Sequence, residues 1–389
     1  MIGDENFNKL KNQYIDALVK ELKLYKTTKY FSRKKIATVH FGGGNPLLLG
    51  IEDFEKIIEA IKLNFEIIYD DSWTLEGSVN SVTSVDYMRR LKMLGFSRIS
   101  LGIQTFNENI RRLMHIKSSV QDIYSAVEIL NEANFNDYCF DLMYNLPNQT
   151  EEDLIQDISK ADELNPMHID IYNMAVFPNT YIDKKIKEQN YYSINPSNEN
   201  NIRMYKLADK YLTELGYAPL TTNTYSKRQQ EIHRGDWVYL TNNNVLGLGA
   251  SSRGYISGFS YKNVCDISEY IQQVDQNRFP ANLSLITDKD EQESRLMIMF
   301  PIRLKIMKEE IKNIDKYRDR LDYLKELGLV IETERYIELT NSGRLWSGNI
   351  STLFISNKDW KTYLKIFLNA IKEKNNPYNE DKMGVDNIV

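Results

Sequence analysis

Residues 36–49 read IATVHFGGGNPLLL, an apolar, β-branched run that ends in three glycines and an Asn-Pro pair. The near-continuous apolar character of residues 36–41 predicts a strand buried on both faces, as in a parallel sheet. Gly42, Gly43 and Gly44 remove every side chain where this strand meets its loop, so a ligand or another backbone segment can approach closely. Because α/β sheets and barrels bind ligands at the carboxyl ends of their strands, the stretch predicts either a ligand site or a tight turn.

Strands and helices alternate through the first half of the chain, after an amphipathic helix at residues 5–25. The segments that read as strands are 36–41, 73–78, 98–104, 138–144 and 168–174. Helical patterns lie between them, at about 52–65, 84–94, 120–134 and 151–163. This alternation predicts a parallel sheet with crossover helices, either a barrel or a doubly wound sheet. No GxGxxG motif occurs, so a dinucleotide-binding fold has no support.

The pattern changes after about residue 195, where NPSNENN forms a connector. A helix at 198–215 and a glycine-rich element at 244–252 (NVLGLGASS) follow. The sequence has a helical pattern from about residue 286, followed by two strand-like runs at 329–340. Helices followed by such a hairpin resemble a winged-helix module, here without a basic recognition stripe. We expect an N-terminal helix, a partial barrel, a connecting region that completes the barrel, a C-terminal helical and wing domain, and a disordered tail, at residues 1–30, 31–195, 196–285, 286–372 and 373–389.

Composition narrows the function. A net charge of −5 with 42% apolar and 26% charged residues is typical of a soluble globular protein and gives no reason to expect nucleic acid or an anionic membrane as partner. No signal peptide or transmembrane span is evident, so we expect a cytoplasmic protein. The two cysteines, Cys139 and Cys265, and four histidines show no metal-ligand spacing. A zinc site or a cysteine-ligated cluster built from these residues alone is therefore not expected, and buried packing is expected of both cysteines.

Polar side chains stand on the other predicted strands, near their carboxyl ends. They are Glu76 in TLEGSVN, Gln104 in SLGIQTF and Asp141 in CFDLMYNLP. Burying them is costly unless they meet partners, and a salt bridge inside the barrel is the alternative to a ligand. A glycine turn with two carboxylates and a glutamine fits a ligand that bears an ammonium group and ribose hydroxyls.

The motifs HFGGGNPLLL, LEGSVNS, LGFSRISLGIQTFN, FDLMYNLPNQT, HIDIYN and LGLGASS occur in an order that resembles the oxygen-independent coproporphyrinogen III dehydrogenase family. This family of radical S-adenosylmethionine (SAM) proteins also includes heme chaperones. The resemblance spans about residues 12–355. It implies an α/β fold, a partial (β/α)6 TIM-like barrel with a smaller winged-helix-like C-terminal domain, and a small-molecule site for SAM.

Particular residues match the motifs of this family. The glycines of 42–44 match its contact to the methionine amino group, and Glu76, Gln104 and Asp141 match its polar contacts to SAM. Gly247 and Ala250 lie in the segment that resembles its second glycine-rich element. The resemblance thus implies SAM-binding residues, which are Gly42, Gly43, Gly44, Asn45, Glu76, Gln104, Asp141, Gly247 and Ala250.

The chain also departs from the family. Members carry a CxxxCxxC loop that holds a [4Fe–4S] cluster, whereas no cysteine precedes Cys139 here. Ile116 stands where an Arg is expected to contact the SAM carboxylate, although Arg111, Arg112 or Lys117 could compensate. Asn45 replaces a usual Thr, which is mild, and Asn145 in YNLP replaces a usual Gly, so we expect a left-handed backbone there.

These departures leave several functions open. The chain could be a truncated form of an active radical SAM oxidoreductase of tetrapyrrole metabolism, or a cluster-free descendant without classical radical chemistry, which we favour. A cluster-free chain could act as a heme or porphyrin carrier or as a partner subunit; His115 or His233 would be the axial ligand, and Trp237 and Tyr239 could stack on the ring. A cluster-independent SAM-dependent transferase is least favoured, because no general base is evident.

Overall fold

A curved seven-stranded sheet forms the centre of the molecule, with strand order β2-β4-β5-β6-β7-β9-β8. The computed structural model describes residues 5–69, 73–176, 183–184, 198–227, 238 and 240–355. Five neighbouring strands are parallel: β2 (His40–Phe41), β4 (Trp73–Ser78), β5 (Phe96–Gln104), β6 (Asp137–Tyr144) and β7 (His168–Asn173). The sheet ends with the antiparallel strands β9 (Thr224–Ser226) and β8 (Ala218–Pro219).

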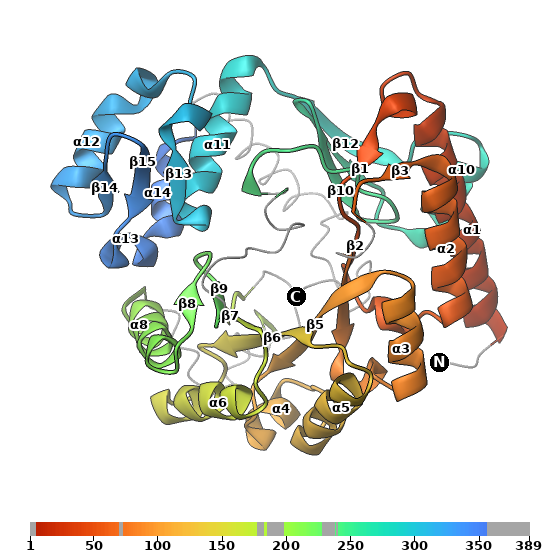
Figure 1. The fold of residues 1–389 in the computed structure, drawn as a ribbon, viewed down its shortest axis with the longest axis horizontal. Coiled ribbons are helices and arrows are strands. Elements are labelled where there is room, and N and C mark those ends of the chain that lie inside the picture. Colours follow the sequence, from red (N-terminus) through yellow and green to blue (C-terminus); the bar gives the residue numbers. More distant parts are fainter. Residues whose placement is uncertain are drawn as a thin grey trace.

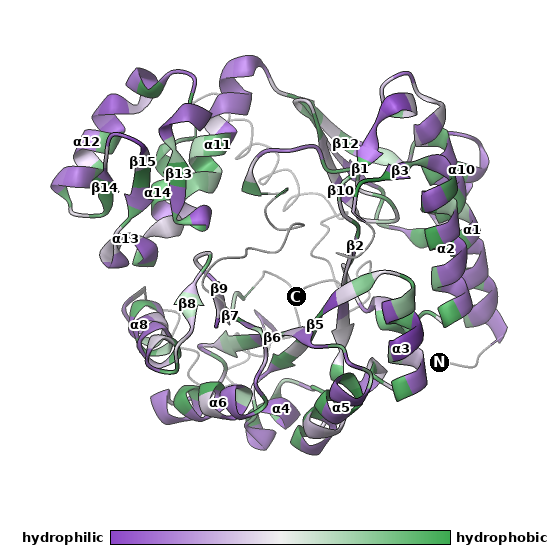
Figure 2. Cartoon of the chain, in the orientation of Figure 1, coloured by the Kyte–Doolittle hydropathy of each residue, from purple (hydrophilic) through white to green (hydrophobic). Residues whose placement is uncertain are grey.

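Helices cover the outer face of this sheet (Figure 1). They are α2 (Ile51–Asn64), α3 (Val85–Met93), α4 (Glu108–Leu113), α5 (Val120–Glu132), α6 (Glu151–Glu163) and α8 (Asn198–Glu214). Several begin at a polar side chain that accepts a hydrogen bond from the first turn, as Ser119 does for α5 and Thr150 for α6. Figure 2 shows both hydrophobic and hydrophilic residues on these helices, as expected when one side faces the sheet.

The two faces of the sheet differ in chemistry. On β5 the side chains of Ile99, Leu101 and Ile103 are fully buried against the helices. The alternate residues of the same strand, which face the inside of the barrel, include Arg98, Ser100, Gly102 and Gln104. The alternation therefore predicts the strand correctly, and it places polar groups on the inner face.

The strand predicted at residues 36–41 is only partly correct. The segment forms two short strands, β1 (Lys35–Ile36), which pairs with β3 (Glu66–Ile67), and β2, which pairs with β4. Its residues are half-buried or exposed rather than buried on both faces. The physical reason is position, since β2 lies at the edge of the sheet and has one described neighbour. The helix α4 was not predicted.

The N-terminal helix α1 (Glu5–Thr27) packs against α2 and against α10 (Ile267–Asp275). Close to α10 lies a second, antiparallel sheet that no motif in the sequence indicates. It consists of β10 (Arg253–Ile256), β11 (Phe259–Asn263) and β12 (Ala281–Ile286), with β12 at one edge. The expectation for residues 196–285, a connecting region that completes the barrel, did not include this sheet.

The C-terminal region has a hydrophobic core of its own, which includes Phe300, Tyr317, Leu321 and Ile337. Its helices are α11 (Lys289–Arg303), α12 (Arg318–Glu326), α13 (Asn341–Leu345) and α14 (Ser347–Leu353). The predicted hairpin is confirmed as β14 (Val330–Glu332) and β15 (Tyr336–Leu339), and β13 (Lys305–Met307) adds a third strand. The expected tail at 373–389 lies outside the described residues.

The C-terminal region is joined to the main sheet by an ion pair. Arg344 donates two hydrogen bonds of 2.8 Å each to the carboxylate of Asp209 on α8, and Tyr225 of β9 donates a third of 2.8 Å. Such a bidentate pair fixes orientation as well as distance. Within the described part of the chain, no helix is both long and apolar enough to cross a membrane.

Candidate functional site

The glycine turn after β2 is closed around the carboxylate of Glu76. The Gly43 amide donates to Glu76 Oε2 at 2.9 Å, and His40 Nε2 lies 3.0 Å from Glu76 Oε1. A Cβ on Gly42 would lie 2.2 Å from His40 Nε2, so a larger residue would displace the His40 side chain from Glu76. Burial would raise the pKa of Glu76, but the hydrogen bonds from His40 and Gly43 outweigh it and lower that pKa. The turn therefore presents an ionised carboxylate beside open backbone.

Gln104 ends β5 in a strained conformation. Its φ of +66° lies in the left-handed region, which a non-glycine residue occupies at a cost. Its side chain folds back over Gly102, where a Cβ would lie 2.8 Å from Gln104 Nε2. The Oε1 atom is buried and has no hydrogen-bond partner among the residues the structure describes. A buried amide oxygen in this state is an acceptor ready for a ligand donor.

Asp141 lies on the inner face of β6 and forms part of a buried acidic group. Its Oδ1 accepts a 2.9 Å hydrogen bond from Ser100, and its strand partner on β7 is Asp170. One ligand atom each of Cys139, Asp141 and Asp170 lie within 4.8 Å of one another. Burial first, and the charge of Asp170 second, raise the pKa of Asp141 well above its usual range. The two carboxyl groups therefore lie buried side by side where β6 and β7 pair.

A buried network supports the ends of β5 and β6. Arg111 is fully buried, and its Nη1 donates to the carbonyl oxygens of Ile103 and Thr105 at 2.7 Å each, on either side of Gln104. Asp157 accepts from the Phe106 amide at 2.6 Å. Burial raises the pKa of Asp157 to about 6, although these hydrogen bonds oppose the shift. The network holds the strained Gln104 backbone in place.

Arg111 therefore cannot take the role of the missing cation at Ile116. Its Nε also donates to the Ser118 carbonyl at 2.9 Å, so the guanidinium is committed to the backbone below the site. Arg112 is exposed and bonds to Asn109, and Lys117 is exposed. The possibility that Arg111 compensates was wrong, because its donors are taken up by backbone carbonyls at the end of β5 and by Ser118.

Asn45 has a local role in the structure. Its amide nitrogen donates to Ser78 Oγ at 2.8 Å and to Ser81 Oγ at 2.7 Å. Its oxygen accepts from the Ser78 amide at 3.3 Å. Asn45 therefore ties the glycine turn to the loop after β4, so it positions the turn from behind.

The second glycine-rich loop is anchored to α1. The Gly247 amide donates to Tyr261 and its carbonyl accepts from the same hydroxyl, at 3.0 and 2.9 Å. The Ala250 amide donates to Tyr14 of α1 at 3.1 Å. A Cβ on Gly247 would lie 2.2 Å from the Arg253 carbonyl oxygen, which explains this glycine by close packing. These hydrogen bonds do not involve Gly42–Gly44, Glu76, Gln104 or Asp141, and a ligand role for the loop stays a prediction.

The other candidates are less informative. His115 is exposed at the end of α4, with a φ of +56°. His233, Trp237 and Tyr239 lie outside the described residues. Cys139 is buried as expected, whereas Cys265 is exposed, so the expectation of burial was wrong for Cys265.

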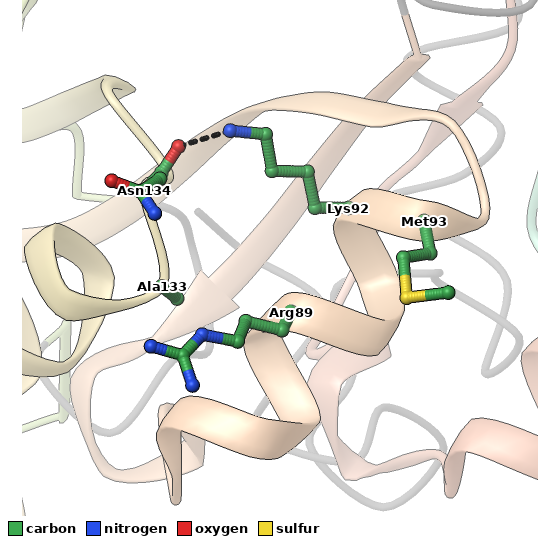
Figure 3. Close-up of a pocket in the computed structure, with 5 residues that line it drawn as sticks. All are labelled: Arg89, Lys92, Met93, Ala133 and Asn134. Carbon is green, nitrogen blue, oxygen red and sulfur yellow. Dashed lines mark hydrogen bonds between the residues drawn. The ribbon is translucent and has the colours of Figure 1, made fainter.

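A shallow hollow lies at the opposite edge of the sheet from the site, between α3 and the end of α5 (Figure 3). Its lining residues are Arg89, Lys92, Met93, Ala133 and Asn134. Arg89 donates to the Glu132 carbonyl at 2.8 Å and Lys92 donates to the Asn134 carbonyl. These cations cap the carboxyl end of α5, so packing accounts for the hollow.

One functional candidate, Asp170, was missed in the sequence, whereas Tyr172 was expected at the end of its strand. Asp170 faces Asp141 across the strand pair, and Tyr172 donates to Asp170 at 3.2 Å. The signal was present in HIDIYN, where polar residues alternate with apolar ones as they do around Asp141. The combined site is rich in acceptors and suits a ligand with several N–H, O–H or ammonium donors.

Comparisons with known proteins show which family the chain resembles. A family model described as the radical SAM superfamily matches residues 7–161. The oxygen-independent coproporphyrinogen III oxidase of Escherichia coli K12 is 26% identical over 365 residues, covering 88% of this chain and 78% of the relative. The heme chaperone HemW of Buchnera aphidicola is 26% identical over 354 residues, covering 88% and 90%.

A solved structure is similar in fold. The E. coli coproporphyrinogen III oxidase HemN, described as a radical SAM enzyme, aligns with a TM-score of 0.75 and 24% identity. The alignment covers 88% of this chain and 83% of that chain, so it includes the partial barrel and the C-terminal region. Residues 7–161 therefore match the radical SAM superfamily, and the chain is similar over 88% of its length to coproporphyrinogen III oxidases and heme chaperones.

Proposed function

We propose that this chain binds S-adenosyl-L-methionine at the carboxyl ends of β2, β4, β5 and β6. The observation that carries the proposal is the buried, unpartnered Oε1 of Gln104 at the end of β5, together with the open space over Gly43 in the turn after β2. Leaving such an oxygen unpaired costs about 1–3 kcal/mol, which a ligand donor recovers. A ligand site requires both of these features: glycines that leave room beside the backbone, and an acceptor atom that has no partner within the protein.

The polar groups fit the functional groups of SAM. The carbonyls of the glycine turn and the ionised Glu76 suit its ammonium group. The carboxyl oxygens of Asp141 and Asp170 suit ribose hydroxyls, which donate hydrogen bonds. We assign no cation to the carboxylate of SAM, because Arg111 donates its hydrogen bonds to backbone carbonyls. SAM would supply an adenosyl and a methionyl group to this site.

A [4Fe–4S] cluster does not fit the residues present. The sequence contains two cysteines, one buried on β6 and one exposed next to α10, and cluster ligation requires thiolates gathered in one loop or pocket. We therefore infer that these 389 residues bind SAM without generating a radical by themselves. The chain then acts in the cytoplasm as a degenerate, SAM-binding relative of the tetrapyrrole proteins, alone or with a partner subunit.

Calorimetry with SAM tests the site. We expect Gln104→Ala and Asp141→Asn each to weaken SAM binding about tenfold or more, since each removes a buried hydrogen bond to the ligand. Gln156→Ala is the matched control, because this glutamine bonds to Glu152 on the outer surface of α6. Equal affinity of wild type and both site variants would refute the site.

A comparison of SAM with decarboxylated SAM tests whether a cation contacts the SAM carboxylate. We expect decarboxylated SAM to bind within about threefold of SAM, because no charged donor is assigned to the carboxylate. A loss of tenfold or more with the decarboxylated ligand would show that a cation contacts the carboxylate after all. Either result is independent of the Gln104 and Asp141 variants.

The names of the relatives raise a second ligand class, heme or porphyrin. A heme titration followed in the Soret region tests it, with His115→Ala as the variant for the candidate axial ligand among the described residues. A saturable Soret shift lost in His115→Ala would support a carrier role with this axial ligand. Absence of a saturable shift would leave SAM as the ligand of the barrel.

A further inference from the structure

The strand β12 is an open edge with unusual exposure. All six of its residues, ANLSLI, are exposed, and the side chains of Leu283, Leu285 and Ile286 are 55%, 47% and 78% accessible. Phe279 just before the strand and Phe259 beside it are exposed as well. Natural edge strands are commonly protected by charged residues, bulges or prolines within the strand. The segment ANLSLI contains no charge and no proline.

The backbone of this edge has a defined register. Thr287 donates its amide to the Gly258 carbonyl at 2.7 Å, one residue beyond the pairing of Ile286 with Phe259. Because backbone groups alternate in an antiparallel pair, those of Leu283 and Leu285 face β11. The amides and carbonyls of Asn282, Ser284 and Ile286 consequently face outward, where β12 has no described strand neighbour.

The outward-facing amides and carbonyls of one copy can pair with the same groups of a second copy. If a second copy pairs antiparallel about Ser284, each outward residue meets another outward residue: Ser284 meets Ser284 and Asn282 meets Ile286 of the second copy. The same register places Leu283 opposite Leu285 of the second copy, on one face. Four leucine side chains then lie next to each other across the two-fold axis, and close cross-strand apolar pairs stabilise sheets.

Charge also favours this orientation. Arg278 precedes the strand, and Asp288 and Asp290 follow it. Antiparallel pairing brings the basic end of one copy to the acidic end of the other, whereas parallel pairing would place like charges together. A second copy is thus better matched to this edge than an arbitrary peptide.

We propose that two copies of this chain associate through β12, forming one continuous six-stranded antiparallel sheet across a two-fold axis. A six-residue strand is small beside the ~800 Å² per partner of a standard interface, so we expect a reversible dimer with a Kd on the order of tens of micromolar. The proposal rests on β10–β12 alone and is independent of what the barrel binds.

Sedimentation velocity over about 1–200 μM protein tests the proposal, a range that brackets the expected Kd. We expect wild type to shift from monomer to dimer across this range. Ser284→Pro removes an outward amide while leaving the β11 ladder intact, and Leu283→Lys with Leu285→Lys removes the apolar contact. Both variants should stay monomeric. Ile331→Lys on β14, which is 53% exposed in the C-terminal region, is the matched control and should still dimerise.

Three results would overturn the proposal: wild type that stays monomeric throughout, a dimer that persists in Ser284→Pro, or a dimer that persists in the leucine double variant. Amide hydrogen exchange of wild type serves as a second measurement in case a variant misfolds. The amides of Ser284 and Ile286 should exchange about three- to fivefold more slowly at the highest than at the lowest protein concentration, as the monomer fraction falls. Unchanged exchange at these two amides would also overturn strand pairing.

Discussion

Glu21 offers a prediction about stability that follows directly from burial. This α1 carboxylate is fully buried and accepts from the Gly249 amide at 2.8 Å, from Tyr270 at 2.8 Å and from Asn263 at 2.9 Å. It therefore ties the N-terminal helix to the second glycine-rich loop and to α10. Burial raises the pKa of Glu21 from 4.5 to about 7, and the three hydrogen bonds only partly offset this shift.

The pH dependence follows from the sign of this shift. Because the folded-state pKa lies above the unfolded value of 4.5, the stability contributed by Glu21 is complete below that value and is lost as the pH rises through about 7. Linkage gives a loss of about 2 kcal/mol in the free energy of unfolding between roughly pH 5.5 and pH 8.5. Glu21→Gln has no such titration, and its amide faces the Gly249 donor at a cost of about 1 kcal/mol at every pH.

Urea unfolding of both proteins across this pH range measures the effect. We expect the free energy of wild type minus that of Glu21→Gln to fall by about 2 kcal/mol from acid to alkaline pH. Other groups, including Asp157 with its pKa of about 6, are present in both proteins and cancel in the difference. A difference that stays constant within about 0.5 kcal/mol, or that rises with pH, would refute the reasoning.

Three further predictions concern the site. Arg111→Met should destabilise the chain by on the order of 3 kcal/mol in urea unfolding, because it removes hydrogen bonds from buried carbonyls. Arg112→Met at an exposed position is the control and should change the free energy of unfolding by less than about 0.5 kcal/mol. Similar effects of the two variants would contradict the role assigned to Arg111. Gly42→Ala should weaken SAM binding about tenfold or more in calorimetry, because its Cβ would lie 2.2 Å from His40 Nε2. Gly50→Ala is the control and should bind SAM normally, because its Cβ would meet Asp53 Oδ2 at 3.5 Å. Unchanged binding by Gly42→Ala would count against a SAM site at the glycine turn. Anaerobic reconstitution should leave the chain without a stoichiometric cluster, and absorbance near 400 nm with about four irons per chain would overturn that expectation.

Much of the barrel could be predicted because its strands alternate in a regular way. Segments such as FSRISLGIQ place Ile99 and Leu101 outward and polar residues inward, so both the strand and its inner face follow from spacing. The left-handed backbone expected of Asn145 is confirmed, with a φ of +63°. Its conformation is a local property, which residue type predicts well.

Features that depend on distant contacts could not be predicted. The strained backbone of Gln104 is held by the side chain of Arg111, and nothing in the residues next to Gln104 indicates a positive φ. Asp170 becomes informative only when strand order places it opposite Asp141. The short strands of the second sheet lack clear alternation, because β12 is exposed on both faces.

The polar inner face of the main sheet has a consequence for the thermodynamics of ligand entry. The inner face of β5, β6 and β7 carries Arg98, Ser100, Asp141 and Asp170, so a ligand bound there exchanges its hydrogen bonds to water for hydrogen bonds to protein. Little apolar surface is removed from water in this exchange. We expect ligand binding in this barrel to be driven by enthalpy with a small heat-capacity change. Binding to an apolar pocket would instead give a large negative heat-capacity change.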